Sequence, residues 1–292
     1  MRLKDHLLYW LQTPFFHHST GKPLTTSESI RVDNYIKQGL SPFSSEPLPF
    51  NTVNRLKSSN YSYDWYRIIS RRDSKKGHWC FGDVTEALQE PTFVKSRPIS
   101  TNNQNNILLP LDTNRHLTFY RDKRDFHGKN DCAIWRGAAY QKHRISFLEA
   151  TSSIGSCNVA STHHRGKHFW SKPTGWMSIQ KQLCNKFIFA IEGNDVASNL
   201  KWVMGSNSIA IMPKPKYETW FCESFLEPGR HYIEIAEDFS DVEDVLEHYL
   251  NNPKVCKEIL DEAHLFVSPF RDLTREFQIA RQVVERYVEA VQ

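Results

Sequence analysis

The sequence lacks the marks of several common protein classes. No apolar run approaches the ~20 residues that a membrane-spanning helix requires. No GxxxxGK[ST] motif is present, which argues against a P-loop enzyme or kinase. Lys and Arg form no dense stripe and the net charge is only +4, so we expect no nucleic-acid partner. A nucleic-acid-binding protein that uses the many aromatic and basic residues is a rival hypothesis, and it predicts steeply salt-dependent binding.

Cysteine and metal-ligand patterns are also sparse. The six cysteines are scattered without a CxxC pair, which favours reduced thiols in a cytoplasmic protein over a disulfide framework or zinc site. Residues 162–168, THHRGKH, contain three histidines. Adjacent histidines on an extended segment point to opposite faces, and no nearby carboxylate or Cys completes a tetrahedral set. We read this segment as a basic loop and expect no metal and no cofactor.

The chain termini carry no recognisable targeting signal. The first residues, MRLKDHLLYWLQ, are amphipathic, but Asp5 and His6 interrupt them and no small-residue cleavage site follows, so we do not expect a signal peptide. The last residues, EAVQ, are not an ER-retention signal. The amphipathic start and the basic patch at residues 71–76 suggest weak peripheral contact with the inner membrane as a hypothesis.

What is present is typical of a globular α/β protein. The 292 residues suffice for two domains, and the 39% hydrophobic and 24% charged content is that of a soluble fold. The most informative stretch is residues 186–221. An apolar run at 187–191 predicts a strand, residues 192–195 a tight turn, 197–204 a helix and 209–212 a second strand. This order predicts one βαβ unit of a parallel sheet.

The turn of this unit has the chemistry of a phosphate-binding corner. Ligands of open α/β sheets gather at the carboxyl ends of strands. Gly193 permits a sharp turn or a close approach to a ligand. Ser198, Asn199 and Lys201 fall on the first turns of the expected helix, where free N–H groups and the dipole favour an anion. The alternative is an ordinary βα turn with a solvated lysine.

A further strand is expected to end in Arg136 and Gly137, and a helix over residues 144–150 is expected to follow it. Together with the 186–221 stretch, this segment resembles glycosyltransferase family 90, which includes the Rumi-like protein O-glucosyltransferases and bacterial lipopolysaccharide glycosyltransferases. The resemblance is good over roughly residues 130–270 and loose over the first hundred. The matching features are Trp135-Arg136-Gly137, Arg144, Glu192-Gly193, Ala197, Asn199, Lys201, Ser208 to Ile211, Tyr217 to Phe221 and His231-Tyr232-Ile233.

The resemblance implies an α/β fold with two Rossmann-like domains of the GT-B type. An acceptor-side domain would comprise residues 1–135, with a C-terminal helix at 271–292 crossing back to it, and a nucleotide-sugar-binding domain residues 136–270. The implied activity is inverting, metal-independent transfer from a UDP-sugar of the glucose or xylose type. The implied acceptor is a hydroxyl of a lipopolysaccharide core or another surface glycan.

The resemblance also assigns the donor-binding residues. Arg136 and Gly137 would face the donor at the domain hinge, and Arg144 would contact the pyrophosphate, to which a planar guanidinium donates two parallel hydrogen bonds. A domain-closing salt bridge is the alternative for Arg136. Glu218, in the first turn of a helix expected at residues 217–225, would cap that helix or accept the ribose hydroxyls. Arg97 is placed on the acceptor side.

Two departures from the family pattern concern the chemistry. Asn199 stands where the protein O-glucosyltransferases carry a phosphate-binding Arg. Their catalytic Asp lies in an Arg-Asp-aromatic-Pro box, whereas here Arg97 is followed by Pro98. Asp83 and Asp195 are therefore base candidates by chemistry and expected position alone. The missing Asp also supports a rival hypothesis, a non-catalytic protein of the same fold that binds sugar nucleotides or glycans.

Overall fold

The structure, a computed structural model, describes residues 22–54, 59–70, 72, 74–162 and 175–291. The amphipathic first residues and the histidines of residues 163–168 lie outside these ranges. The described chain divides into two units. The first comprises residues up to 116, 217–222 and from 272 onward, and the second comprises 117–216 and 223–271.

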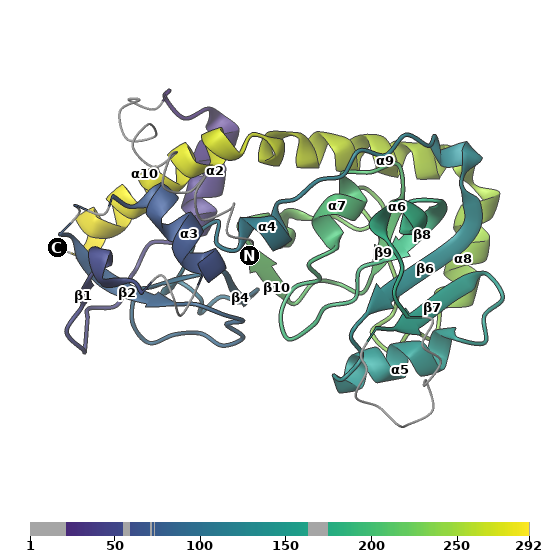
Figure 1. The fold of residues 1–292 in the computed structure, drawn as a ribbon, viewed down its shortest axis with the longest axis horizontal. Coiled ribbons are helices and arrows are strands. Elements are labelled where there is room, and N and C mark those ends of the chain that lie inside the picture. The colour runs from purple at the N-terminus through teal and green to yellow at the C-terminus, as the bar shows by residue number, and fades with distance from the viewer. Residues whose placement is uncertain (1–21, 55–58, 71, 73, 163–174, 292) are drawn as a thin grey trace. The chain divides into compact units, whose positions relative to one another are not determined.

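The second unit contains a five-stranded parallel sheet (Figure 1). The strands lie in the order β11-β9-β8-β6-β7, and each neighbouring pair is parallel. When the five strands are numbered in chain order and the sheet is read from β7 to β11, this is the 2-1-3-4-5 order of doubly wound folds of the flavodoxin type. The strands are β6 (Asn130–Gly137), β7 (Cys157–Ser161), β8 (Asn185–Phe189), β9 (Ile209–Met212) and β11 (Ile233–Glu234).

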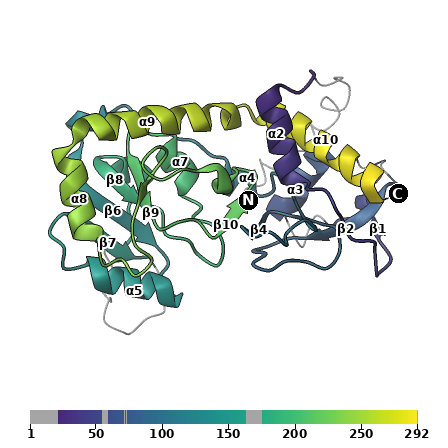
Figure 2. The ribbon, with the colours of Figure 1, turned by 180° about the vertical axis from the view of Figure 1, so that it is seen from behind.

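The apolar content of these strands follows from their burial on both faces. Every residue of β9 is buried, as are four of the five residues of β8. Alternate residues such as Phe187 and Phe189 join one core cluster with side chains of α5, α8 and α9 (Figure 2). The helices are α5 (Lys142–Thr151), α6 (Ile179–Gln182), α7 (Leu200–Met204), α8 (Val242–Asn251) and α9 (Pro253–Val267), with 3₁₀ turns η2 (Phe126–Gly128), η3 (Glu223–Phe225) and η4 (Ser268–Arg271).

Residue types that favour a helix start agree with the structure at α9 but not at α8. Pro253 occupies the first position of α9, as expected for a residue without an N–H group. The sequence Ser240 to Glu243 predicts a capping box, but Asp241 is the N-cap of α8 and its side chain makes no capping bond. Both oxygens of Asp241 instead accept the N–H of Ala236.

The first unit contains a smaller sheet in the order β1-β2-β3-β5. The last three strands are parallel, and β1 is an antiparallel edge. Residues 81–91 and 95–105, all described, connect the parallel strands without a helix. A separate two-stranded ribbon pairs β4 with β10. The strands are β1 (Leu48–Pro49), β2 (Lys76–Cys80), β3 (Thr92–Val94), β4 (Ser96–Pro98), β5 (Asn106–Leu108) and β10 (Tyr217–Thr219).

Aromatic side chains form much of the core of the first unit. Phe50 meets Trp65 edge-on with ring centroids 5.5 Å apart, and Phe93 lies 4.3 Å from Tyr287. Trp65 belongs to a helix, although the aromatic and β-branched residues of the stretch 64–70 favour a strand. The helical elements are α2 (Thr26–Tyr35), η1 (Phe50–Thr52), α3 (Ser59–Ile68), α4 (Thr113–His116) and α10 (Leu273–Val291).

The structure confirms an α/β fold with parallel sheets, and two Rossmann-like domains of the GT-B type stay a prediction. The predicted division at residues 135/136 runs through β6, and the structure assigns this whole strand to the second unit. Residues 272–292 group with the first unit. No helix in the described ranges is long and apolar enough to cross a membrane.

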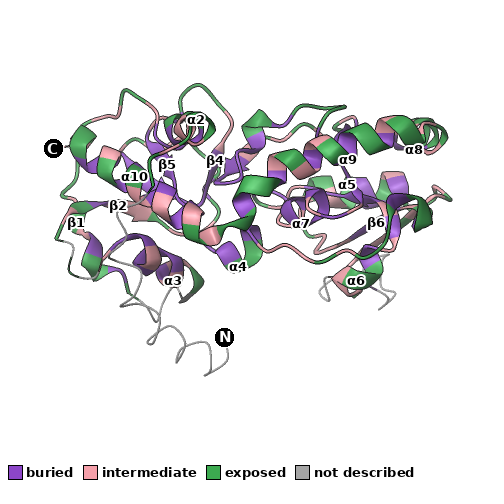
Figure 3. Cartoon of the chain, turned by 90° about the horizontal axis from the view of Figure 1, so that it is seen from above, coloured by how far each residue is buried: buried purple, intermediate pink, exposed green. Residues whose placement is uncertain are grey.

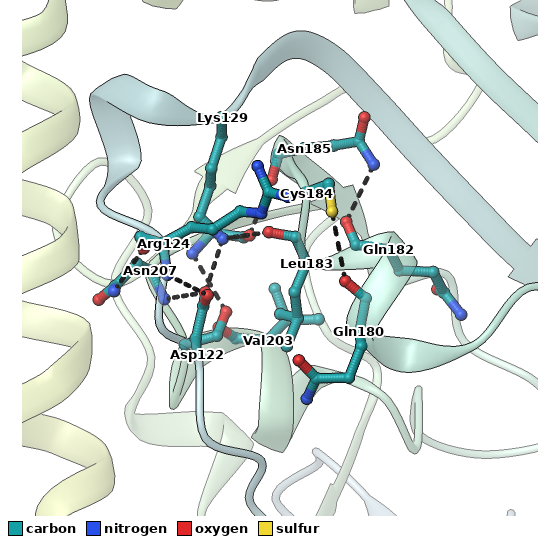
Figure 4. A network of polar contacts seen from close by, with 12 residues as sticks. Asp122, Arg124, Lys129, Gln180, Gln182, Leu183, Cys184, Asn185, Val203 and Asn207 are labelled. Atoms are coloured by element: carbon teal, nitrogen blue, oxygen red, sulfur yellow. Dashed lines mark hydrogen bonds and ion pairs between the residues drawn. The ribbon is translucent and has the colours of Figure 1, made fainter.

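A buried lysine joins three segments at the amino edge of the second sheet (Figure 4). Lys129 Nζ lies 2.6 Å from a carboxylate oxygen of Asp122 and 2.8 Å from the Ser208 hydroxyl, and it also donates to the carbonyl of Leu183. Asp122 accepts the N–H of Asn207 at 3.0 Å as well. Burial lowers the pKa of Lys129, whereas the Asp122 carboxylate favours its charged form. This network fixes the segment that leads into β6.

Replacing Lys129 by Met should therefore destabilise the protein strongly. The substitution leaves the Asp122 carboxylate buried without its cation, a change that typically costs about 3–5 kcal/mol. Lys216→Met is the matched control, because Lys216 and its partner Glu237 are 57% and 66% exposed and such pairs contribute about 0–1 kcal/mol. Urea unfolding measures both variants. Equal midpoints for the two would contradict the role of Lys129.

Candidate functional site

The strand order of the second unit defines where a ligand is expected. Strands β6 and β8 are neighbours, but the chain leaves β6 towards β7 and leaves β8 towards β9 on the other side. Ligands of such sheets bind outside the carboxyl ends of the strands at this point of reversal. We call the carboxyl ends of β6 and β8 the switch point. It contains the predicted Gly137 and Gly193.

Arg144 of α5 joins the two strand ends at the switch point. Its Nη1 donates to the carbonyl of Ala138 at 2.9 Å, beyond β6. Its Nη2 and Nε donate to the carbonyls of Ile191 and Glu192 at 2.7 and 2.8 Å, beyond β8. The guanidinium carbon also lies 5.5 Å from the ring of Trp135, within cation–π range. The half-buried Arg144 is thus held in place at the switch point, where it was predicted to contact a pyrophosphate.

The two glycines permit close packing at this point. A Cβ on Gly137 would lie 2.5 Å from the ring of Trp135, so only Gly fits beside that ring. A Cβ on Gly193 would lie 3.3 Å from Arg144 Nη2. Neither glycine has a left-handed backbone. Gly193 therefore serves close approach of the Arg144 side chain, not a positive φ.

The first turn of α5 adds polar groups that the sequence interpretation missed. A helix start leaves N–H groups without intrahelical partners, and the N-cap residue Gln141 makes no capping bond. The Gln141 side chain donates instead to Asn194 at 3.1 Å. His143 Nε2 lies 2.7 Å from the carbonyl of Glu192. The run Gln-Lys-His-Arg at residues 141–144, shortly after the Arg-Gly strand end, was the available signal, because polar residues there begin a helix at a carboxyl edge.

The other predicted phosphate contacts are arranged differently. Helix α7 is buried along its whole length (Figure 3). Lys201 is 1% exposed and forms an ion pair with the equally buried Glu223, so the structure does not present it at the turn. Asn199 donates to the carbonyl of Phe189 at 2.9 Å. Ser198 precedes it in the turn and is half-buried.

Arg136, predicted to face the donor, is bound to neighbouring strand residues in the structure. Its Nη1 donates to the carbonyls of Trp135 and Asn158 at 2.8 and 2.7 Å, and its Nη2 donates to the Asn158 side chain at 2.6 Å. Partial burial lowers the pKa of Arg136. Alternation along β6 places it on the opposite face from Trp135. The structure therefore holds Arg136 against β7.

Glu218 and Arg97 form a buried ion pair within the first unit. Residues 217–219 form β10, not the first turn of a helix, and Glu218 lies opposite Arg97 of β4. Arg97 Nε donates to Glu218 at 2.8 Å, and Nη2 donates to the carbonyl of Asn34 at 2.6 Å. The Arg97 and Glu218 side chains are 0% and 1% exposed. The helix expected to begin at residue 217 is therefore wrong, whereas the acceptor-side role of Arg97 and the ribose-binding role of Glu218 stay predictions for two side chains that are buried in this pair.

The two base candidates differ in accessibility. Asp195 of the second unit is 5% exposed. Asp83 of the first unit follows β2 and has a 30% exposed side chain, and it pairs with the buried Lys95 at 2.5 Å. Asp83 therefore has both a fixed partner and an open side.

Further carboxyl groups lie near the same edge of the first sheet. Asp112 follows β5 and accepts a hydrogen bond from Asn60 at 3.2 Å. Asp64 of α3 accepts the backbone N–H and the hydroxyl of Thr113 at 2.7 and 2.9 Å. Burial raises the pKa of Asp64 to about 7 and also raises the pKa of Asp112. The sequence placed Asp112 at a strand end but gave no reason to single it out.

The geometry defines an α/β protein with an oriented arginine at a topological switch point, and the comparisons identify its family. The profile of glycosyl transferase family 90 matches residues 109–288. An O-glucosyltransferase, LpsA, of Dichelobacter nodosus is 40% identical over 240 residues, which cover 80% of this chain and 73% of the relative. The chain belongs to glycosyl transferase family 90 and is a glycosyltransferase, as its sequence predicts.

Gly137→Ala should destabilise the protein because the new methyl group overlaps the Trp135 ring. Overpacking of this kind costs about 1–3 kcal/mol. Gly155→Ala is the matched control, because its Cβ would meet nothing within 4 Å. Urea unfolding of both variants tests the packing, and a Gly137→Ala midpoint equal to that of Gly155→Ala would contradict it.

Asp64 should make stability depend on pH. Folded Asp64 keeps its proton up to about pH 7, whereas the ordinary value is 3.8. Between these values the folded state binds more protons, so the free energy of unfolding falls as pH rises, by up to about 1.4 kcal/mol per pH unit. Asp64→Asn should flatten this dependence, and Asp33→Asn, at a 68% exposed carboxylate, should not. Urea unfolding at pH 4.5 and 7.5 measures both; equal slopes in Asp64→Asn and the parent protein would refute the shift.

Proposed function

We propose that the enzyme moves a sugar of the glucose or xylose type from a UDP-sugar to a hydroxyl of a lipopolysaccharide core or another surface glycan. We further propose that the transfer inverts the anomeric centre and requires no metal. Membership of family 90 supports glycosyl transfer. The activity named for the 40% identical relative, an O-glucosyltransferase, supports glucose and an oxygen acceptor.

The observation that carries the donor proposal is the position of Arg144. A departing diphosphate gains negative charge, which fixed cationic groups and helix N-termini stabilise. Arg144 is already oriented by three carbonyl groups at the switch point, in the first turn of α5. Its fixed position means that little reorganisation is required when charge develops. In this proposal Arg144 and the α5 N-terminus bind the diphosphate.

We propose Asp83 as the catalytic base. A base must reach the acceptor hydroxyl, and Asp83 is more exposed than Asp195. The nearby ammonium of Lys95 favours the ionised carboxylate. As Asp83 accepts the hydroxyl proton, the acceptor oxygen forms a bond to the anomeric carbon. The bond between that carbon and the diphosphate breaks, and its electron pair leaves with UDP.

The proposed acceptor implies a place of action. Surface glycans of this kind are assembled at the cytosolic face of the inner membrane, so we propose a cytoplasmic enzyme with peripheral membrane contact. Co-sedimentation with anionic lipid vesicles tests this contact. Protein that stays in the supernatant at low salt would argue against it.

Arg144→Ala should weaken UDP binding at least tenfold, because the diphosphate loses its oriented guanidinium. Arg230→Ala is the control, since Arg230 lies in an exposed pair with Glu262. Calorimetry measures binding, and UDP release from a panel of UDP- and GDP-sugars with crude lipopolysaccharide core measures transfer. Release should survive EDTA. Loss of release on chelation would overturn metal independence, and unchanged UDP binding in Arg144→Ala would overturn the site.

A further inference from the structure

Three charged groups follow three neighbouring strands of the first sheet. Strands β2, β3 and β5 are parallel, and their last residues, Cys80, Val94 and Leu108, lie in register. Asp83, Lys95 and Asp112 follow these strands at the same carboxyl edge. We call these three residues the Lys95 centre.

The lysine of this centre is buried and requires a counter-charge. Lys95 is 1% exposed, and its ammonium lies 2.5 Å from Asp83 Oδ1. Removing the anion from a buried pair leaves an uncompensated charge, which is strongly unfavourable. If Asp83 is the catalytic base, it becomes neutral in each turnover. The Lys95 centre therefore needs a second anion during the reaction.

Asp112 is placed to supply that anion. It is 4% exposed, and Asn60 fixes one of its oxygens at 3.2 Å. Burial raises the pKa of Asp112, whereas Arg115, Asn60 and Lys95 favour its charged form. The remaining carboxyl group nearby, Asp64, is engaged by Thr113. Asp112 is thus the second carboxylate acting on the same lysine.

We propose that Asp112 is a positioning residue for proton transfer: it remains the counter-charge of Lys95 while Asp83 takes the proton of the acceptor hydroxyl. This inference rests on the proposed role of Asp83. The proton moves from the acceptor oxygen to the Asp83 carboxylate and later to solvent, and Asp112 itself neither gains nor loses a proton. Its negative charge makes protonation of Asp83 more favourable.

The proposal predicts the direction in which the pH dependence of kcat/KM changes when Asp112 loses its charge. Without the charge of Asp112, Lys95 holds Asp83 ionised more strongly, so Asp83 becomes a weaker base. In Asp112→Asn the acid limb of the kcat/KM profile should move to lower pH by about one unit, and the plateau rate should fall about tenfold. UDP affinity should not change, because the donor site lies in the second unit. Asn also tolerates the left-handed backbone of this position, where φ is +56°.

The experiment compares pH profiles of UDP release and calorimetric UDP binding for four variants: Asp112→Asn, Asp112→Glu, Asp83→Asn and Asp33→Asn. Asp112→Glu retains the charge and should restore most of the rate and the position of the limb. Asp33→Asn is a matched substitution at an exposed carboxylate of the same unit and should behave like the parent protein. Circular dichroism spectra confirm folding of each variant.

The outcomes separate this proposal from the proposed function. An unshifted acid limb in Asp112→Asn overturns the role of Asp112. Full activity of Asp83→Asn overturns the base assignment and, with it, this inference. Absence of UDP binding and release in the parent protein overturns the proposed function instead.

Discussion

The contact between the Arg144 guanidinium and three backbone carbonyls holds the switch point together. Strands β6 and β8 end in loops that run in opposite directions. Arg144 satisfies carbonyls on both sides and packs over Trp135, whose ring in turn requires glycine at position 137. The Arg144 guanidinium therefore connects the ends of β6 and β8 with the start of α5, beside the two glycines. The same cation is suited to a diphosphate because its fork is rigid and permanently charged.

Helix α7 has a comparable role where the chain enters and leaves the second unit. A Cβ on Gly205, just beyond α7, would lie 2.8 Å from Phe119, near the first entry, and 3.1 Å from Arg271, at the last exit. Arg271 also donates to the Gly205 carbonyl at 2.7 Å. Lys201 of the same helix pairs with Glu223, where the chain returns after β10. The buried lysine of α7 thus anchors a crossing point. Lys201 was predicted to be an anion ligand because it lies at the start of a helix. Its ammonium is instead paired with the Glu223 carboxylate.

The sequence was most informative where neighbouring residues decide the structure. Periodicity predicted β8 and β9 well, although α7 begins three residues later than expected, and Pro253 marked the start of α9. The helix predicted for residues 217–225 was wrong because the conformation of this stretch depends on β4, about 120 residues earlier. Arg97 of β4 pairs with Glu218. Residues 64–70 are rich in β-formers, yet residues 64–68 are helical because Trp65 packs into an aromatic core assembled from distant segments. No local pattern reports such partners.

Exposure then separates charged residues that maintain the fold from those available for chemistry. Arg97, Glu218 and Lys201 are each at most 1% exposed and paired, so their charges are neutralised inside the protein. Arg144 and Asp83 are different: each is oriented by protein groups on one side and remains partly accessible on the other. A group that acts on a substrate needs both properties, because orientation without access is structural and access without orientation gives little stabilisation of developing charge. In a sheet built from parallel strands, both properties are met at the carboxyl edge. Side chains just beyond the strand ends reach solvent there, while the adjoining strands hold their backbone in place.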